Sequence, residues 1–252
     1  MTPCWLSATR RRPGSRSPSQ AELATEFGRI TRADHLLDLG CGPGILTDAL
    51  SRVAGEAEGV DFAANMIRVA RRRFPDLRFQ VANGEELPFG DSHFDVTVCN
   101  YTAHHFARPE RVFREILRTL KPDGRVIVIH PIQAGQMSWG SFAEALAEVL
   151  PPEELPGGPL LATADPEDFE RLLSHCGYSV VRAERRVKPL VMPNIDQLWE
   201  AGFRIAGLQD QPPEIQDQIR TGTFARAAKF RESDGSYRFP DAVLVATAQK
   251  PA

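Results

Sequence analysis

The sequence contains no long hydrophobic run and no closely spaced pair of cysteines. No apolar stretch approaches the roughly 18 residues that a helix needs to cross a bilayer. The four cysteines lie far apart in the chain, at positions 4, 41, 99 and 176. Without a C-x-x-C pair they indicate reduced thiols, and neither a disulfide framework nor a metal site is predicted. We therefore expect a cytoplasmic protein that makes no contact with a membrane.

The sequence also lacks a strong excess of charge of either sign. Its 30 basic and 33 acidic residues leave a formal charge of −3 over 252 residues, which gives no reason to expect a nucleic-acid partner. The hydrophobic content of 42% and the charged content of 25% are those of ordinary globular proteins. A chain of this length forms one large domain, or one domain with a modest insertion.

Residues 1–19 differ from the rest of the chain, because they are rich in Arg, Ser and Pro and contain few core-forming side chains. This composition predicts a disordered basic tail. The arginines are also compatible with a targeting peptide or with an arm that contacts RNA. We favour a tail without a binding role.

Beyond the tail, segments with strand-like and helix-like periodicity alternate. This alternation predicts an α/β fold with a doubly wound, mostly parallel sheet. Strands are expected at 36–39, 57–60, 77–82, 94–99, 125–130, 178–187 and 242–248. Helices are expected at 20–29, 45–53, 65–74, 110–120, 137–149, 166–176, 195–208 and 213–229. A turn is expected at 121–124, and a type I turn would tolerate Asp123 at its third position.

The connection between the last two expected strands is unusually long. We interpret residues 189–240 as a helical cap inserted near the active site, and residues 20–188 together with 241–252 as the α/β domain. Four apolar residues of the cap favour a compact, partly apolar ligand. They are Trp199, Phe203, Ile205 and Leu208.

The most informative segment is LLDLGCGPGILT, which runs from Leu36 to Thr47. A short apolar run containing an acid is followed by three glycines that alternate with other residues, and a helical pattern then begins. Glycine permits positive φ values and close approach of a ligand to the backbone, and a helix start offers unpaired N–H groups to an anionic group. The G-x-G-x-G spacing differs from those of dinucleotide-binding folds and P-loops.

Polar residues follow four of the expected strands. Ligands of doubly wound sheets bind at the carboxyl ends of the strands. Asp61 ends the second strand, where a carboxylate can accept hydrogen bonds from both hydroxyls of a ribose. The other groups are Gly40-Cys41-Gly42, Asn83-Gly84-Glu85 and Asn100-Tyr101. Each group alone is typical of a polar loop, but four in phase predict one binding site.

With Asp38 two residues before the first glycine, the glycine-rich segment resembles motif I of the class I S-adenosylmethionine (SAM) methyltransferases. Residues 82–89, 94–100, 104–106 and 114–125 look like the small-molecule branch of that family, the ubiquinone/menaquinone-biosynthesis type (methyltransferase type 11). The likeness spans roughly residues 34 to 131. It implies a seven-stranded fold and SAM as the methyl donor.

The resemblance also implies roles for individual residues. Gly40 and Gly42 would face the methionine part of SAM, and Asp61 would bind its ribose. Phe62 or Met66 would pack on the adenine. The complete set of expected cofactor residues is Asp38, Gly40, Cys41, Gly42, Asp61, Phe62, Met66, Asn83, Gly84, Glu85, Asn100, Tyr101 and His105. In this set Asn83 and Glu85 would lie near the adenine edge. Asn100 and Tyr101 would border the reacting methyl group.

Three histidines at strand ends are candidates for a general base, namely His104, His105 and His130. Methyl transfer from a sulfonium is a one-step displacement that needs neither an enzyme nucleophile nor a metal, and alignment of the reactants can supply around 7–11 kcal/mol. A hydroxyl or an acidic carbon as acceptor also calls for a base with a pKa near neutrality. The alternative is that the His-His-Phe segment shapes the loop.

The leading hypothesis is a SAM-dependent methyltransferase that acts on an O, N or C atom of a small organic acceptor, a metabolite or a product of secondary metabolism. We expect it to be a monomer or a homodimer. A second hypothesis is an enzyme of the same fold that keeps SAM bound and catalyses a cyclisation or rearrangement without methyl transfer. A non-catalytic SAM-fold subunit and an RNA methyltransferase aided by the basic tail are further alternatives.

Overall fold

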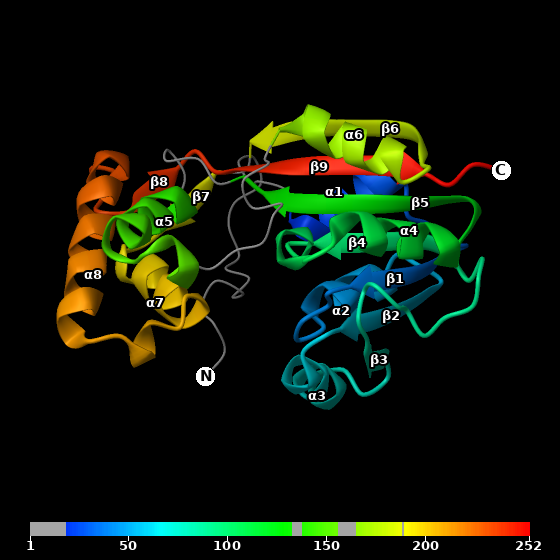
Figure 1. Ribbon diagram of the computed structural model, residues 1–252, viewed down its shortest axis with the longest axis horizontal. Helices are drawn as coiled ribbons and strands as arrows, with labels where there is room; N and C mark the ends of the chain where they lie inside the picture. Colours follow the sequence, from blue (N-terminus) through cyan, green and yellow to red (C-terminus); the bar gives the residue numbers. More distant parts are fainter. Residues whose placement is uncertain (1–18, 133–137, 156–164, 188) are drawn as a thin grey trace. The chain divides into compact units, whose positions relative to one another are not determined.

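The computed structural model describes residues 19–132, 138–155, 165–187 and 189–252, so the expected tail lies outside the described residues except for Ser19. The chain divides into two compact units (Figure 1). We call Pro18–Pro131, Gly157–Arg186 and Val243–Ala252 together the sheet unit. Ile132–Pro156 and Val187–Ala242 together are the helical unit.

The sheet unit contains a seven-stranded sheet in the order β3-β2-β1-β4-β5-β9-β6. The strands are β1 (His35–Leu39), β2 (Glu56–Asp61), β3 (Arg78–Val81), β4 (Phe94–Asn100), β5 (Leu120–Pro131), β6 (Ser179–Val187) and β9 (Ala242–Gln249). The pairs from β3 to β5 are parallel, and β9 runs antiparallel to β5. The predicted α/β fold with a doubly wound, mostly parallel sheet is thus confirmed.

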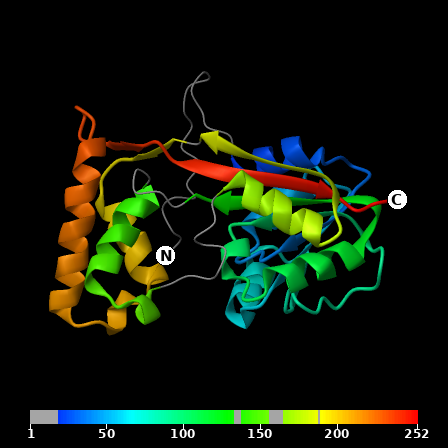
Figure 2. The same cartoon turned by 45° about the horizontal axis from the view of Figure 1, so that its top comes forward.

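Helices cover both faces of this sheet (Figures 1 and 2). They are α1 (Gln20–Gly28), α2 (Ile45–Ser51), α3 (Ala64–Arg73), α4 (Pro109–Thr119) and α6 (Pro166–His175). The start of α1 is fixed by a capping box, in which the Ser19 hydroxyl accepts from the N–H of Glu22 and the Glu22 carboxylate accepts from the N–H of Ser19. Such a cap satisfies two N–H groups that a helix start leaves without partners.

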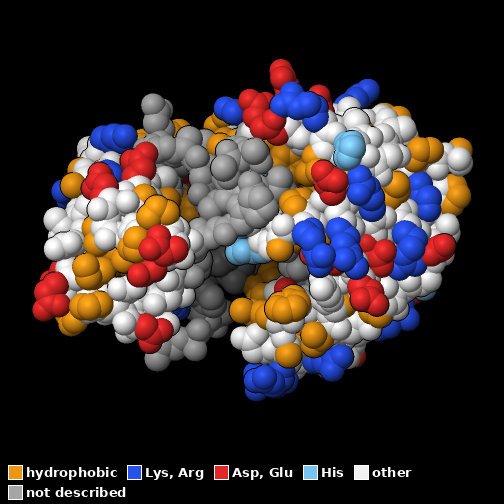
Figure 3. All heavy atoms as spheres, in the orientation of Figure 1, with side chains coloured by type: hydrophobic (Ala, Val, Ile, Leu, Met, Phe, Trp, Pro, Cys, Tyr) orange, Lys and Arg blue, Asp and Glu red, His pale blue; other side chains and the backbone are white. Residues whose placement is uncertain are grey.

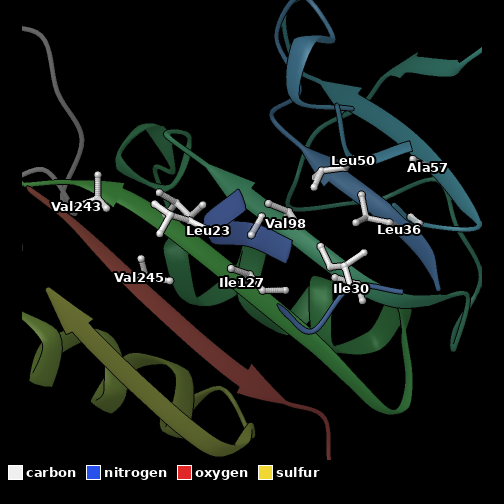
Figure 4. Close-up of a cluster of buried hydrophobic side chains, with 13 residues drawn as sticks. Leu23, Ile30, Leu36, Leu50, Ala57, Val98, Ile127, Val243 and Val245 are labelled. Carbon is white, nitrogen blue, oxygen red and sulfur yellow. The ribbon is translucent and has the colours of Figure 1, made fainter. Parts of the chain in front are cut away.

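One face of the sheet packs on α1 and α2 through a cluster of fully buried apolar side chains (Figure 4). Leu23 of α1 and Leu50 of α2 contribute to this cluster, together with Leu36 of β1 and Val98 of β4. Side chains alternate between the two faces along a strand. The side chain of Asp38, two residues after Leu36, therefore points toward the same face as the cluster.

The expected turn at 121–124 differs from the observed backbone. Between the pairs Phe94–Leu120 and Val96–Arg125 the register of β4 and β5 shifts, so 121–124 lie opposite a single residue of β4. Asp123 has a φ of 61°, whereas the third residue of a type I turn has a φ near −90°. The prediction of a type I turn was therefore wrong.

The helical unit contains α5 (Ser138–Val149), α7 (Asp196–Ile205) and α8 (Pro213–Ala227), with a small antiparallel pair of β7 (Leu190–Met192) and β8 (Tyr237–Phe239). Gly202 of α7 lies so close to α5 that an added Cβ would be 2.5 Å from the ring of Phe142. Glycine is thus required for this helix packing. No described helix of either unit has the length and apolar character of a membrane span.

The boundary between the two units differs from the one expected from the sequence. The expected α/β domain, 20–188 with 241–252, included residues 132–156, and the expected cap was 189–240 alone. The structure groups 132–156 with the helical unit, because Phe142 and Leu146 of α5 share an apolar core with Leu208 and Ile219.

The same core explains the apolar residues that were expected to favour a ligand. Leu208 is fully buried in it, and Trp199 and Phe203 pack against it. The side chain of Ile205 lies outside the described part of the structure. Packing in the core of the helical unit is enough to explain why these positions are apolar. These side chains therefore give no support to a particular substrate.

Candidate functional site

The glycine-rich loop after β1 is held tightly against its neighbours. Gly40 has a φ of 76°, and an added Cβ would lie 2.1 Å from the hydroxyl oxygen of Thr102, so only glycine fits. The N–H groups of Gly40 and Cys41 both donate to the carbonyl of Val60, at 2.8 and 2.9 Å. These two N–H groups are therefore committed to the sheet. Gly40 and Cys41 therefore offer no free N–H group to a ligand.

The side chain of Cys41 also faces the protein interior. It is buried in a cluster with Ile67 and Phe79, and its Sγ lies 3.7 Å from the carbonyl oxygen of Gly42. Burial is the largest cause that raises the pKa of this thiol, and Asp38 and Asp61 add to it. The thiol therefore stays protonated at neutral pH and is suited to packing.

Asp38 connects β1 to α2. Its carboxyl group is buried and accepts a hydrogen bond of 2.6 Å from the hydroxyl of Thr47. Burial raises the pKa of Asp38 to about 7, and the negative charge of Asp61 contributes in the same direction. Because Asp38 is buried, its position favours a role in orienting the loop and α2.

Asp61, the last residue of β2, has both carboxylate oxygens held by backbone N–H groups. One carboxylate oxygen accepts from the N–H of Gly42 and the other from the N–H of Ala63, both at 2.8 Å. Each oxygen has a further lone pair for a ligand. An added Cβ on Gly42 would meet no atom within 4 Å, so open space adjoins this carboxylate.

Large apolar side chains are exposed near the same strand ends. Phe62, directly after β2, is 80% exposed, and Met66 of α3, Val81 at the end of β3 and Tyr101 after β4 are exposed as well. Figure 3 shows hydrophobic side chains gathered on the surface of the sheet unit over the region of α3. Clusters of exposed apolar residues mark binding surfaces.

The segment Asn83-Gly84-Glu85 follows β3, as the sequence predicts. The sequence did not predict the ion pair that Glu85 forms. The carboxylate of Glu85 is largely buried and pairs with the guanidinium of Arg108, directly before α4, with Arg111 nearby. Asn83 is exposed and accepts from the N–H of Glu85 at 3.0 Å. An added Cβ on Gly84 would be 3.3 Å from Val112. Glu85 therefore secures this segment to α4, and Asn83 remains accessible to a ligand.

The end of β4 carries two unusual features. The side-chain oxygen of Asn100 is buried and has no hydrogen-bond partner among the described residues. Tyr101 has a φ of 52°, and its N–H donates to the carbonyl of Ile129 at 2.8 Å. Positive φ in a residue other than glycine is uncommon, and such strain often occurs at functional sites.

The three candidate histidines form a cluster in the sheet unit. The ring of His104 lies 4.0 Å from that of His105 and 5.6 Å from that of His130, centroid to centroid. Burial lowers the pKa of His104 to about 3 and that of His130 to about 4. Burial also lowers the pKa of His105, against the opposing effect of the Asp61 charge.

These pKa values separate the three histidines as candidate bases. All three are neutral at pH 7, but an imidazole with a pKa of about 3 or 4 is a weak base. His105 is the most exposed of the three and lies within electrostatic reach of Asp61. It is therefore the best candidate for proton transfer, and His104 and His130 are better suited to packing.

Comparisons with known proteins find methyltransferases among the proteins similar to this chain. Residues 37–128 match the model of a family described as a methyltransferase domain. An uncharacterized methyltransferase of Bacillus subtilis, YcgJ, is 39% identical over 104 residues, which cover 39% of this chain and 41% of YcgJ. The ubiquinone/menaquinone biosynthesis C-methyltransferase UbiE of Azotobacter vinelandii is 37% identical over 113 residues, which cover 41% of this chain and 45% of UbiE. The chain thus matches less than half the length of each of these relatives.

Solved structures share the fold over most of the chain. The crystal structure of the Bacillus subtilis YcgJ protein aligns with a TM-score of 0.64 at 22% identity and covers 92% of this chain and 98% of that one. The cyclase SpnF aligns with a TM-score of 0.59 at 18% identity, covering 92% of this chain and 80% of that one. At these identities the likeness concerns the fold alone.

Proposed function

We propose that this chain, whose residues 37–128 match the model of a methyltransferase domain, is a SAM-dependent enzyme that methylates an O, N or C atom of a small organic acceptor. One observation carries the proposal. The Asp61 carboxylate is fixed by two backbone N–H groups beside the open space at Gly42, with the exposed ring of Phe62 next to it in the chain. A fixed carboxylate suits a ribose diol, and an exposed apolar side chain suits the face of a base.

The residues at the strand ends fit SAM part by part. Asp61 would accept hydrogen bonds from the ribose, and Phe62 or Met66 would cover the adenine. The accessible amide of Asn83 suits the polar edge of that base. Gly42 leaves room for the methionine part, since no atom lies within 4 Å of its Cβ position. SAM supplies an electrophilic methyl group on a sulfonium.

The chain's own contribution to the reaction is mainly positioning. Holding the two reactants in line can supply around 7–11 kcal/mol. Asn100 and Tyr101 would border the reacting groups. The side-chain oxygen of Asn100, which has no partner within the described ranges, can accept a hydrogen bond there. With a hydroxyl or acidic carbon as acceptor, neutral His105 would take up the proton.

A small acceptor fits the charge balance, because the formal charge of −3 does not favour a polyanionic substrate. UbiE, a relative of this chain, is named for ubiquinone and menaquinone biosynthesis, which is in keeping with an organic acceptor that is neither a nucleic acid nor a protein. We expect the enzyme to act in the cytoplasm on a metabolite, as a monomer or a homodimer.

Calorimetry with the full chain tests the cofactor part of the proposal. SAM and S-adenosylhomocysteine are both expected to bind with a stoichiometry of one per chain. Transfer of label from methyl-labelled SAM to a panel of phenols, amines and acidic carbon compounds would then identify the acceptor. The proposal is wrong if neither nucleoside binds.

A non-methylating cyclisation or rearrangement is the second candidate function. Burial makes His104 and His130 weak bases, with pKa values of about 3 and 4, and a reaction that needs no proton transfer is compatible with such side chains. Product analysis distinguishes the two functions. A product that gains 14 mass units as S-adenosylhomocysteine forms indicates methylation, whereas an isomer formed without S-adenosylhomocysteine indicates cyclisation.

A further inference from the structure

Three potential metal ligands lie together near the amino-terminal ends of the strands, opposite the candidate cofactor site. His35 is the first residue of β1, His93 directly precedes β4, and Glu58 lies in β2. Strands β1 and β4 are parallel. Their first residues therefore lie at the amino-terminal ends of the strands, and the glycine-rich loop and Asn100 lie at the carboxyl ends. This cluster is therefore separate from the site described above.

The three side chains are close enough to share one ion. One ligand atom from each side chain lies within 4.8 Å of the other two. Among the described residues, no other group of three His, Cys, Asp or Glu side chains meets this distance. The Nε2 atom of His35 is 2.8 Å from a carboxylate oxygen of Glu58. A carboxylate oxygen of Glu56 lies 4.0 Å from the same nitrogen.

Neighbouring side chains orient both imidazole rings. His93 stacks on Phe89 with centroids 5.5 Å apart, and it meets Phe94 edge to face at 4.7 Å. His35 also packs on Phe94 at 4.7 Å, and its backbone N–H donates to Asp95 at 2.9 Å. The ring contacts restrict the orientations of both imidazoles.

The cluster is also accessible from solvent. His35 and Glu58 are partly buried, whereas His93 is exposed, which provides a path for entry. Arg78 lies 3.4 Å from the Glu58 carboxylate but closer to that of Glu56. A cation between the histidines and Glu58 would replace Arg78 as the partner of the Glu58 carboxylate, and Arg78 would keep its ion pair with Glu56.

We propose that His35, Glu58 and His93 bind a divalent transition-metal ion, with Zn²⁺ as the best match. Zn²⁺ takes imidazole nitrogen and carboxylate oxygen ligands at about 2.0–2.2 Å in tetrahedral geometry. Two histidines and one glutamate leave the fourth position to water or to Glu56. The ion would connect the starts of β1 and β4 to β2, so its role is to stabilise the sheet unit.

The test uses untagged full chain that has been stripped of metal with EDTA. Calorimetry with Zn²⁺ is expected to give one site per chain. His93→Ala is the first variant, because His93 is exposed and its removal leaves the core intact. It is expected to weaken Zn²⁺ binding at least about tenfold. The matched control is His175→Ala, which removes an exposed histidine of α6 that pairs with Glu110, and it should bind like the wild type.

A second measurement separates a structural site from loose surface binding. Saturating Zn²⁺, at about 100 times its Kd, is expected to raise the Tm of the wild type by about 5–10 °C. Glu58→Gln, which keeps the size of the side chain, should show much less of this rise. Equal Zn²⁺ affinity in the wild type and His93→Ala would overturn the proposal, as would a Tm that does not respond to Zn²⁺.

Discussion

Replacing Asp61 with asparagine removes the charge of this side chain with little change in its shape. The two carboxylate oxygens accept from Gly42 and Ala63, but asparagine has only one oxygen. At the other position an NH₂ group would meet an N–H donor. At least one hydrogen bond to the ribose is also weakened, and a bond to a charged group contributes about 1.5–3 kcal/mol. We expect S-adenosylhomocysteine to bind about 10- to 150-fold more weakly.

The assay is calorimetry of S-adenosylhomocysteine binding to the full chain. Adenosine, which contains the ribose, is expected to lose affinity in parallel, whereas methionine should not. Asp76→Asn is the matched control, because Asp76 is an exposed aspartate beyond α3. Thermal unfolding must accompany the assay, since an N–H group of Gly42 or Ala63 left without a partner costs about 1–3 kcal/mol of stability.

One result would refute this reasoning. If the wild type binds S-adenosylhomocysteine and Asp61→Asn binds it within twofold as tightly, then Asp61 does not hold the ribose. The exposed apolar side chains at the strand ends would then have to be explained by another ligand.

Three further predictions concern other parts of the sheet unit. Burial raises the pKa of Asp38 from 3.8 to about 7, so the stability it contributes is present below about pH 4 and is lost as the pH rises through 7. Asp38→Asn should therefore gain stability relative to the wild type between pH 5 and 8, by up to about 3 kcal/mol in urea unfolding, and a difference independent of pH would contradict this. Val180 has a φ of 49° and is 62% exposed, so Val180→Asn is expected to raise the Tm by about 2–4 °C; an unchanged or lower Tm would argue against strain there. Since the pKa of His105 is lowered, kcat/KM should be flat above pH 7 and fall only below about 6.5. His105→Gln should lower kcat roughly 100-fold, and a variant with the same rate and profile would assign proton transfer to another group.

The elements of the sheet unit were predictable because burial leaves a local signature. In β4, Val96 and Val98 pack on the cluster beside α1 and α2, while Thr97 and Cys99 point to the opposite face and are buried as well. A strand covered on both faces is therefore a short and almost continuous apolar run. The helices show one apolar stripe each, as α4 does with Val112, Phe113 and Ile116.

Elements that depend on distant partners left no such signature. Strands β7 and β8 have three residues each, and the pair Leu190–Phe239 joins residues 49 positions apart. The amphipathic pattern of α5 predicts a helix but does not say which apolar surface covers it. Its partners, Leu208 and Ile219, lie more than fifty residues further along the chain.

In the candidate site, too, some features were predictable from local sequence and others depend on distant contacts. The position of Asp61 at a strand end and the room beside Gly42 follow from local motifs. The pairing of Glu85 with Arg108 does not, because it depends on how the start of α4 docks. The ligands of the proposed metal site are 23 and 35 residues apart, and the parallel register, in which His35 pairs with Glu56, brings them together. No spacing in the sequence indicates such a site.

The two proposed sites occupy opposite ends of the same strands, and this separation has a measurable consequence. Strand β1 has five residues, so its first and last Cα atoms, four steps of about 3.3 Å apart, are separated by roughly 13 Å. Effects at sites more than about 7–10 Å apart without shared partners are usually additive. Zn²⁺ bound near His35 is therefore expected to raise the Tm and to leave the Kd for S-adenosylhomocysteine unchanged within about twofold. A larger change in this Kd would mean that β1 transmits the binding of the ion to the glycine-rich loop. In that case the buried contact between Asp38 and Thr47, which lies along that path, would be the first place to test by substitution.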